Sequence, residues 1–302
     1  MPAEPHSRSR VASLSHDCWI AIPALRLHHW LKNLLLFVPA IIARAYSPSV
    51  LSNLCIAVVA FGCAASAHYL VNDLLDKEYD RLHVAKRQRP QAAGQLSSRT
   101  AAGLITVLIA VATVCASWLP ATFQLSLAAY LIISLAYSLL LKRVLLIDIL
   151  TLTVLLDLRV AAGAGAAMMS LPGKLLLACS CFFFTLALFK RVAQLSTSIA
   201  PLGRLPGRPY SRGNLPALRV LAAATGVASV LALAIFIDNI GTQVARPGIL
   251  WLVLPLQMTW LGRCFFLANR GKLNEDIVFF VIADLHSYIA LSALTLVLIA
   301  AG

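Results

Sequence analysis

The stretch LSNLCIAVVAFGCAASAHYLVNDLLDKEYDRLHVAKRQRP, residues 51–90, joins a long apolar run to a charged segment. Residues 51–72 are long and apolar enough to cross the hydrocarbon core of a bilayer as one helix. Residues 72–90 carry three spaced acids and then a run of bases. The transition predicts a membrane-spanning helix that ends in a charged site at the membrane surface.

The rest of the chain repeats the apolar pattern. Of its 302 residues, 60% are hydrophobic and 12% are charged, which is typical of a polytopic membrane protein. We therefore predict an all-α protein with a single transmembrane domain over residues 18–302. Residues 1–17 are polar and lack the apolar core of a signal peptide, so they are predicted to form a disordered cytoplasmic tail. Nine spans are predicted, at about 27–47, 51–72, 101–119, 121–141, 147–169, 174–195, 217–238, 247–268 and 277–300.

The bases of this chain, whose net charge is +13, are unevenly distributed between the predicted loops. With the N-terminus in the cytoplasm, 21 of the 25 lysines and arginines lie in inside segments, and three lie outside: Arg44, Lys174 and Arg246. This bias follows the positive-inside rule and places the long charged loops, and any chemistry, on the cytoplasmic face. Because the charge follows topology and no aromatic stacking platform accompanies it, nucleic acid is not an expected partner.

Three aspartates open the charged segment. Asp73, Asp76 and Asp80 are three and four residues apart, so a single helix would place them on one face. Carboxylates so arranged repel each other unless a cation lies among them, and Mg²⁺ with a substrate phosphate suits such a site. We expect all three to be metal ligands and catalytic residues, with Asn72 donating to a metal-bound oxygen. The alternative is a solvated charged loop.

Several groups of bases are candidates to bind phosphate oxygens. Lys86, Arg87 and Arg89 follow the acids directly and are expected to hold a diphosphate. Lys190 and Arg191 lie at the inner end of another span, where ordinary membrane anchoring is an equally good explanation. Lys32, with Arg26, belongs to the segment RLHHWLKN, residues 26–33, which reads either as an interfacial belt or as a phosphate site.

A further polar group surrounds the predicted span 147–169. Tyr137 and Lys142 precede it, and Asp148 and Arg159 lie eleven residues apart, about three helical turns, on one face. An arginine at that depth is unfavourable unless it faces a cavity or an acid. We expect Arg159 to be catalytic and the other three to bind substrate, with a structural ion pair from Arg159 to Asp148 or Asp157 as the alternative.

These motifs together resemble the UbiA superfamily of intramembrane prenyltransferases. NDLLDKEYDRLHVAKRQRP is similar to its first aspartate-rich motif, and the continuation from Lys86 to Gly94 is similar to the branch that includes decaprenyl-phosphate phosphoribosyltransferase. The chain departs from the branch pattern at Leu27, Leu155-Leu156, Gln194 and Leu285. Further matching stretches are RLHHWLKN, YSLLLKRVLLIDIL, LRVAAGA, KRVAQL and ANRGKLNEDIVFF.

The resemblance implies nine helices around a central cavity that opens to the cytoplasm and to lipid. It implies a Mg²⁺-dependent transferase of the bacterial inner membrane, with 5-phosphoribosyl-1-diphosphate (PRPP) as donor and a polyprenyl phosphate as acceptor. Its product would supply arabinose or ribose for surface glycans. The branch also includes rhizobial nodulation proteins implicated in arabinosylating Nod factors.

Two other functions stay open. The first is prenyl transfer from a prenyl diphosphate to an aromatic acceptor, as in quinone synthesis. Those enzymes carry a second aspartate-rich motif, and bases occupy the corresponding region near Lys190. The second is a non-catalytic lipid or anion transporter, which would explain Arg159 but not three spaced acids. Transporters often show inverted repeats with broken helices, and no such pairing is visible in the sequence.

Overall fold

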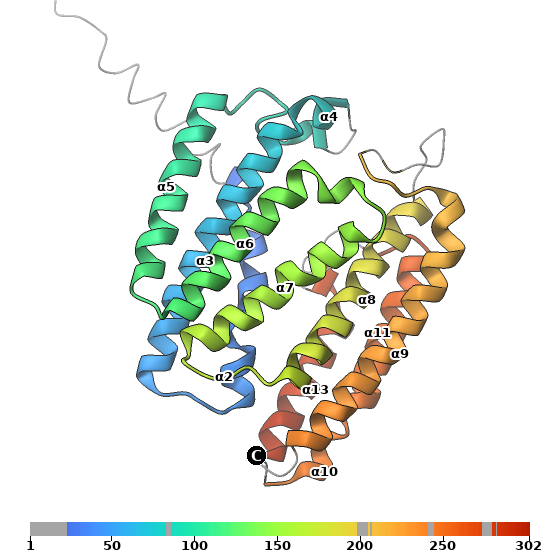
Figure 1. Cartoon of the computed structure of the whole chain (residues 1–302). Coiled ribbons are helices and arrows are strands. Elements are labelled where there is room, and N and C mark those ends of the chain that lie inside the picture. The colour runs from blue at the N-terminus through green and yellow to red at the C-terminus, as the bar shows by residue number, and fades with distance from the viewer. Residues whose placement is uncertain are drawn as a thin grey trace, which may run out of the picture. The chain divides into compact units, whose positions relative to one another are not determined.

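The computed structural model describes residues 23–82, 86–197, 205, 207–240, 245–273, 280–281 and 283–302. The elements that build this part of the chain are helices, which confirms the predicted all-α class (Figure 1). The predicted tail, residues 1–17, lies outside the described residues. The helices group into two compact units, residues 1–138 with 161–169 and residues 139–160 with 170–302. The single transmembrane domain stays a prediction.

The first unit is built around one long helix. Its elements are η1 (Leu27–Phe37), α2 (Val38–Ile42), α3 (Pro48–Leu75), α4 (Lys77–Leu82), η2 (Lys86–Gln88), α5 (Ser98–Ser117) and α6 (Ala121–Leu139). Serines begin the two long helices: Ser47 Oγ accepts from the Val50 N–H, and Ser97 Oγ accepts from the Thr100 N–H. Such caps satisfy amide groups that the first helical turn leaves without a partner. Helix α5 packs along α3 (Figure 1).

Small residues on α3 let neighbouring segments approach closely. A Cβ atom added at Gly62 would lie 2.6 Å from the Trp30 ring, so η1 docks against the bare backbone of α3 at this position. On another side of α3, the Phe61 ring contacts Phe123 and Tyr130 of α6, at centroid distances of 5.8 and 5.1 Å. The alanines and the single glycine of α3 therefore let it serve as the centre of the first unit.

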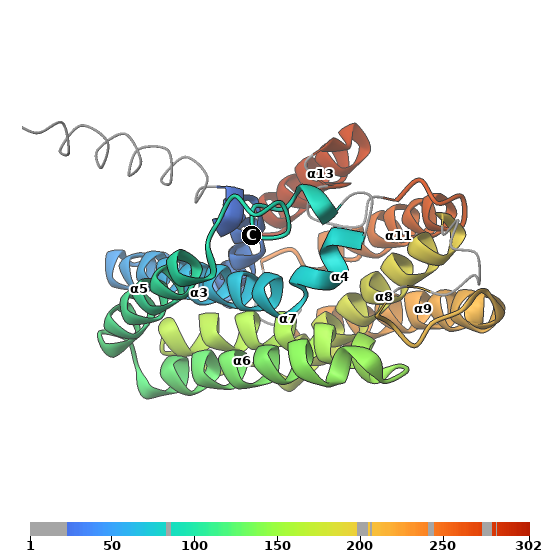
Figure 2. The ribbon, with the colours of Figure 1, turned by 90° about the horizontal axis from the view of Figure 1, so that it is seen from above.

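The second unit is a bundle of apolar helices. Helix α8 packs against α9 and α11, and α11 also packs against α13 (Figure 2). Helix α7 begins in this unit, and its residues from Ala161 onward belong to the first unit. Leu188, Val192 and Leu195 of α8 are buried at the centre of the core. The elements are η3 (Leu141–Arg143), α7 (Ile147–Ala166), α8 (Gly173–Thr197), η4 (Arg212–Asn214), α9 (Leu215–Ile240), α10 (Pro247–Leu250), α11 (Val253–Asn269) and α13 (Leu285–Ala301).

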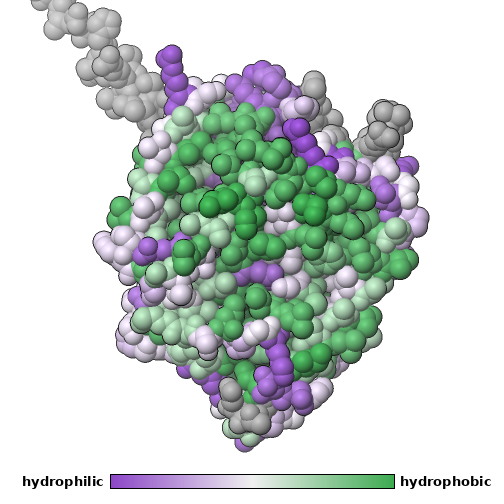
Figure 3. All heavy atoms as spheres, viewed as in Figure 1, coloured by the Kyte–Doolittle hydropathy of each residue, from purple (hydrophilic) through white to green (hydrophobic). Residues whose placement is uncertain are grey.

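Seven helical segments in the described part are long and apolar enough to cross a membrane, and α13 is a shorter apolar helix. Large apolar side chains such as Leu125, Ile132 and Val220 are about 70% exposed on the helices. Hydrophobic residues accordingly cover much of the surface in Figure 3. These features belong to an integral membrane protein.

The predicted count of nine spans is not confirmed. The segment predicted as the first span, 27–47, is not one long helix but the 3-10 helix η1 followed by the five-residue α2. Pro39 lies in the first turn of α2, where proline is compatible with a new helix start but not with the interior of a continuing helix.

Candidate functional site

The three aspartates lie on two helices. Helix α3 ends at Leu75, Asp76 forms its C-cap, and α4 begins at Lys77. The prediction that one helix carries all three acids is therefore wrong. Hydrogen bonds of helical spacing nevertheless cross the junction, because the Asp76 N–H donates to Asn72 O and the Asp80 N–H donates to Asp76 O, at 2.9 and 2.8 Å. Asp73 and Asp80 are buried, and Asp76 is half-buried.

Two arginines hold the two buried carboxylates. Arg26 Nη2 donates to both oxygens of Asp73, at 2.7 and 2.8 Å. Arg89 Nη1 donates to Asp73 Oδ1 at 3.1 Å and to Asp80 Oδ2 at 2.6 Å. We call Arg26, Asp73, Asp80 and Arg89 the Asp73 cluster. Its two acids and two bases balance in charge, and its carboxylates converge on a single nitrogen of Arg89.

A cavity of about 200 Å³ adjoins the Asp73 cluster in the first unit. The Arg26 guanidinium lies 5.2 Å from the centroid of the Tyr69 ring, within the range of a cation–π contact. The cavity is lined by Pro23, Ala24, Arg26, His28, His29, Asp73, Arg89 and Pro90. The cluster therefore has charged groups at the wall of a space that can admit a small anionic group.

The position of Arg26 is set by hydrogen bonds of η1 to α3. Trp30 Nε1 donates to Ser66 Oγ at 3.0 Å, and Ser66 Oγ donates to the Leu25 carbonyl at 2.7 Å. Arg26 itself has φ 50° and ψ 49°. This left-handed conformation is unfavourable by about 1–2 kcal/mol for a residue with a side chain. The surrounding contacts hold Arg26 in it, next to Asp73.

The donor set of the cluster fits a magnesium ion that arrives with phosphate. The described residues contain no ready group of three or more His, Cys, Asp or Glu side chains for a metal ion. They do contain two carboxylates that meet at one point, Asp73 and Asp80. Mg²⁺ is commonly held by one or two carboxylates, with waters and substrate phosphates completing its octahedron. Asp76 as a third ligand stays a prediction.

The other predicted residues of the first unit lie at different depths. Asn72 Oδ1 accepts a hydrogen bond from Ser138 Oγ at 3.1 Å. Tyr137 is buried on α6, Lys32 is half-buried in η1, and Arg87 is exposed. Lys86 begins η2, but its side chain lies outside the described atoms. Of the bases that the sequence analysis named in this unit, Arg26 and Arg89 are the two that the described contacts place against the aspartates.

The second unit contains a different ionic cluster. Asp148 at the start of α7 is fully buried, and Arg191 of α8 is 1% exposed. Arg191 donates to both oxygens of Asp148, from Nε at 2.7 Å and from Nη2 at 2.9 Å. Arg208 Nη1 donates to Asp148 Oδ1 as well. With Tyr210, described next, these residues form the Asp148 cluster, in which one acid meets two bases.

Tyr210 closes this cluster from the loop before α9. It is fully buried, its ring centroid lies 5.8 Å from the Arg191 guanidinium, and its hydroxyl accepts from the Leu146 N–H at 3.3 Å. Burial, helped by the charge of Asp148, raises the pKa of Tyr210 to about 12. Sequence reasoning missed Arg208 and Tyr210, because the surrounding prolines and glycines predicted an irregular loop. The available signal was that arginines and one tyrosine lie between the prolines and glycines of residues 201–216.

The remaining predicted bases of the second unit are Lys142, Arg159 and Lys190. Lys142 is buried in η3, and Lys190 is half-buried on α8. Arg159 is buried within α7, where its Nη1 donates to the Leu155 carbonyl at 2.6 Å. The same helix carries Asp157, which accepts a hydrogen bond from Ser180 at 2.7 Å. Their proposed roles toward substrate stay predictions.

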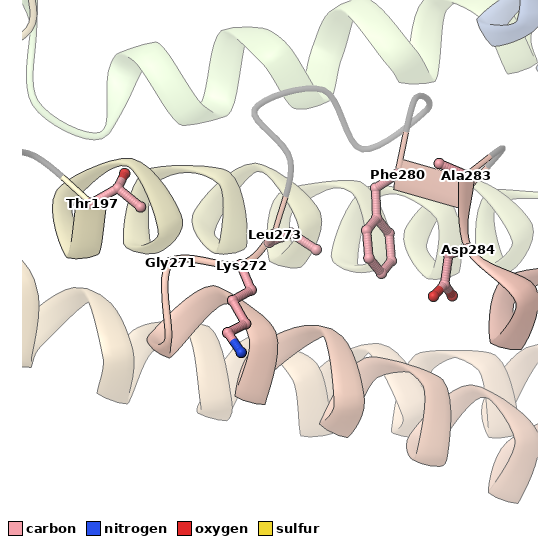
Figure 4. Close-up of a pocket in the computed structure, with 7 residues that line it drawn as sticks. All are labelled: Thr197, Gly271, Lys272, Leu273, Phe280, Ala283 and Asp284. Atoms are coloured by element: carbon pink, nitrogen blue, oxygen red, sulfur yellow. The ribbon is translucent and has the colours of Figure 1, made fainter.

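A second cavity, of about 410 Å³, lies where α8 ends and α11 connects to α13. Figure 4 shows Lys272, Phe280 and Asp284 pointing to the same side of this connection. Arg263 donates to both oxygens of Asp284, at 2.8 and 2.6 Å. Burial alone would raise the pKa of Asp284, but hydrogen bonds from Arg263 and Ser287 outweigh it and hold that pKa below its ordinary value.

The sequence model that describes the UbiA prenyltransferase family matches residues 33–196, more than half of the chain. The chain belongs to the UbiA prenyltransferase family. This confirms the resemblance drawn from the aspartate-rich motif. The matched residues include Asp73 of the first ionic cluster and the pair of Asp148 and Arg191 of the second.

Known proteins of this UbiA family resemble the chain in sequence and fold. It is 31% identical over 283 residues to the nodulation protein NoeC of Azorhizobium caulinodans, and the alignment covers 91% of each chain. It is 34% identical over 179 residues to the decaprenyl-phosphate phosphoribosyltransferase of Mycolicibacterium smegmatis, covering 58% of this chain and 56% of that protein.

A solved UbiA homolog from Archaeoglobus fulgidus, bound to GPP and Mg²⁺, has a TM-score of 0.69 to this chain. The two are 17% identical, and the superposition covers 91% of this chain and 97% of that one. At this identity the likeness shows a shared fold.

Proposed function

We propose that this UbiA-family protein transfers the 5-phosphoribosyl group of PRPP to a polyprenyl phosphate and releases diphosphate. The convergence of Asp73 and Asp80 on Arg89, with Arg26 beside them at the wall of a cavity, carries the proposal. It is supported by similarity to relatives named decaprenyl-phosphate phosphoribosyltransferase. Acids that bind a metal and arginines that bind phosphate oxygens are the two groups that a diphosphate leaving group needs.

Bond cleavage moves negative charge onto the diphosphate. The bond from the anomeric carbon to the diphosphate oxygen breaks, and the electron pair leaves with the diphosphate. Arg26 and Arg89 lie where their N–H groups can donate to these oxygens, so they stabilise the transition state more than the ground state. Mg²⁺ held by Asp73, Asp80 and Asp76 would neutralise the same charge when bound.

The acceptor needs little activation. A polyprenyl phosphate is already an anionic nucleophile, and its oxygen forms the new bond to the anomeric carbon, so no strong general base is required. Lys142, Arg159 and Lys190 are proposed to orient the acceptor phosphate and the 5-phosphate of the donor. Arg191 donates two hydrogen bonds to Asp148, which supports a structural role for this pair beside the substrate contact predicted from sequence.

We propose that the reaction takes place at the inner face of the cytoplasmic membrane. The positive-inside bias supports a location of the Asp73 cluster on the cytoplasmic face of the inner membrane, where a soluble sugar diphosphate is available. The lipid-linked product would supply arabinose or ribose for surface glycans. Similarity to NoeC makes modification of a Nod factor one such use.

The decisive experiment supplies the purified, reconstituted protein with labelled PRPP, a polyprenyl phosphate and Mg²⁺. The expected result is label in the lipid extract, lost when either the lipid phosphate or Mg²⁺ is omitted. If a product forms from a prenyl diphosphate and an aromatic acid instead, the protein is a conventional aromatic prenyltransferase. Movement of lipid or anion across the vesicle membrane with no new product would establish a transporter.

A further inference from the structure

Arg26 and a metal ion on Asp73 would compete for the same atoms. One nitrogen of Arg26 lies within 2.8 Å of both Asp73 oxygens, and Arg89 donates to one of these oxygens as well. Mg²⁺ binds carboxylate oxygens at about 2.0–2.1 Å and demands nearly octahedral geometry. A guanidinium that spans both oxygens blocks that approach and repels the ion. One arginine must therefore leave Asp73 before the metal can bind there.

The contacts of the two arginines identify which one leaves. Arg89 is held by two acids, Asp73 and Asp80, and its shorter contact, 2.6 Å, is to Asp80. Arg89 can release Asp73 and keep a charged partner. The described hydrogen bonds of Arg26 go to Asp73 alone among the acids, and its guanidinium lies over Tyr69 at the cavity wall. Arg26 blocks both oxygens, lines the cavity and has no second acid among its described hydrogen bonds, so it is the arginine that leaves.

We propose that Arg26 is an exchangeable counter-ion, which binds Asp73 in competition with Mg²⁺ and transfers to the diphosphate when the two ligands bind together. The inference rests on the proposed function and adds to it an order of events. Asp73 is only 4% exposed, and a buried carboxylate without a cation is strongly unfavourable. Arg26 therefore neutralises Asp73 whenever the metal does not.

The exchange makes the binding of Mg²⁺ and diphosphate cooperative. Mg²⁺ alone would displace Arg26 and leave its guanidinium without an anionic partner. Diphosphate supplies that partner, so each ligand removes an obstacle to the other. By thermodynamic linkage the two ligands raise each other's affinity by the same factor. A donor with a diphosphate is thereby favoured over a metal ion or a simple anion alone.

Calorimetric titration of the full chain in nanodiscs tests this exchange. Mg²⁺ is titrated alone and then at a fixed concentration of inorganic diphosphate, with wild type and Arg26→Gln. In wild type, diphosphate should tighten Mg²⁺ binding. Arg26→Gln should bind Mg²⁺ alone at least about ten-fold more tightly, the low end of the effect of a contacting arginine on proton binding to a carboxylate. Diphosphate should then add little.

Two further variants control the experiment. Arg99→Gln removes an equal charge from the exposed start of α5 and should leave Mg²⁺ affinity unchanged. Arg26→Lys keeps the charge without the planar fork and should give an intermediate Mg²⁺ affinity; it carries the test if Arg26→Gln does not fold. Equal Mg²⁺ affinity in wild type and the Arg26 variants, or an equal gain in Arg99→Gln, overturns the inference.

The result also separates this inference from the proposed function. A wild-type protein that shows the exchange but forms no labelled lipid from PRPP supports the role of Arg26 and refutes phosphoribosyl transfer. A protein that forms the labelled lipid while Arg26→Gln binds Mg²⁺ like wild type supports the function and refutes the exchange.

Discussion

The Asp73 cluster and the Asp148 cluster both consist of aspartates paired with arginines, but they differ in the ratio of acids to bases. Each has a buried carboxylate that two arginines hold, and at least one of the two lies more than 40 positions away in sequence. In the Asp73 cluster two acids meet two bases, and the side chains of Arg26 and Arg89 are 17% and 25% exposed beside a cavity. In the Asp148 cluster one acid meets two bases, and both Asp148 and Arg191 are almost completely buried.

We infer from the difference in exposure that the two clusters have different tasks. Removing one partner of a fully buried ion pair leaves an uncompensated charge with no access to water, so Asp148 and Arg191 are suited to hold α7, α8 and the loop before α9 together. The arginines of the Asp73 cluster border a cavity and can exchange acid for ligand. We therefore regard the Asp148 cluster as a scaffold and the Asp73 cluster as the reacting site.

The largest effect on activity is expected from Asp73→Asn. The amide removes the charge on which a metal and both arginines depend, and transfer of label from PRPP to lipid should fall at least about 100-fold, as for the loss of a key electrostatic group in other active sites. Thermal unfolding should change little, because the amide oxygen still accepts from Arg26 and Arg89 still holds Asp80. Asp238→Asn, at an exposed position of α9, is the matched control.

Full activity in Asp73→Asn would show that the cluster is not the reacting site. A variant that loses activity only because it unfolds would assign the Asp73 cluster the scaffold task and remove the distinction between the clusters.

The largest effect on stability is expected from Asp148→Asn. It leaves Arg191 buried without its counter-charge, and the free energy of unfolding should fall by about 3–5 kcal/mol. Denaturant unfolding in detergent measures it. Combining Asp148→Leu with Arg191→Met removes both charges and should recover much of the loss. If Asp148→Asn instead unfolds like wild type and loses transfer activity, the Asp148 cluster contacts substrate, as its sequence first indicated.

A smaller effect is expected from the partly buried pair of Asp284 and Arg263. The pKa of Asp284 is below its ordinary value in the folded protein, so the pair stabilises the fold above the unfolded pKa of about 4. This contribution is lost as the pH falls through the folded pKa. Arg263→Gln should therefore lower the melting temperature at pH 6, and its difference from wild type should shrink as the pH falls below about 4. A difference that stays constant with pH would contradict this.

Much of the fold could be predicted from the sequence, because apolar length alone decides which segments can cross a bilayer. The spans that became α3, α5, α6, α7, α8 and α9 match the observed helices to within a few residues. The prediction of the first span was wrong because η1 winds as a 3-10 helix and the separate helix α2 begins at Val38, with Pro39 in its first turn. The apolar content of this segment resembles that of a span, but composition alone does not reveal the break between the two helices.

The candidate site was predictable in composition but not in pairing. Spacing identified Asp73, Asp80 and Arg89, yet it indicated one helix face where the chain changes helices at Asp76. Arg26 lies 47 positions before Asp73. No local pattern connects two residues so far apart, and the same holds for Asp148 and Arg208. Contacts between distant segments depend on tertiary packing, which spacing rules do not contain.

Gly62 is an uncharged position that influences where Arg26 lies in the Asp73 cluster. Trp30 lies against this glycine, and its neighbour Ser66 holds the Leu25 carbonyl next to Arg26. A single methyl group at position 62 would push the indole outward and shift the guanidinium that lies about three helical turns further along α3. Side-chain volume at this buried position can therefore change the placement of Arg26 while every ionic residue is retained.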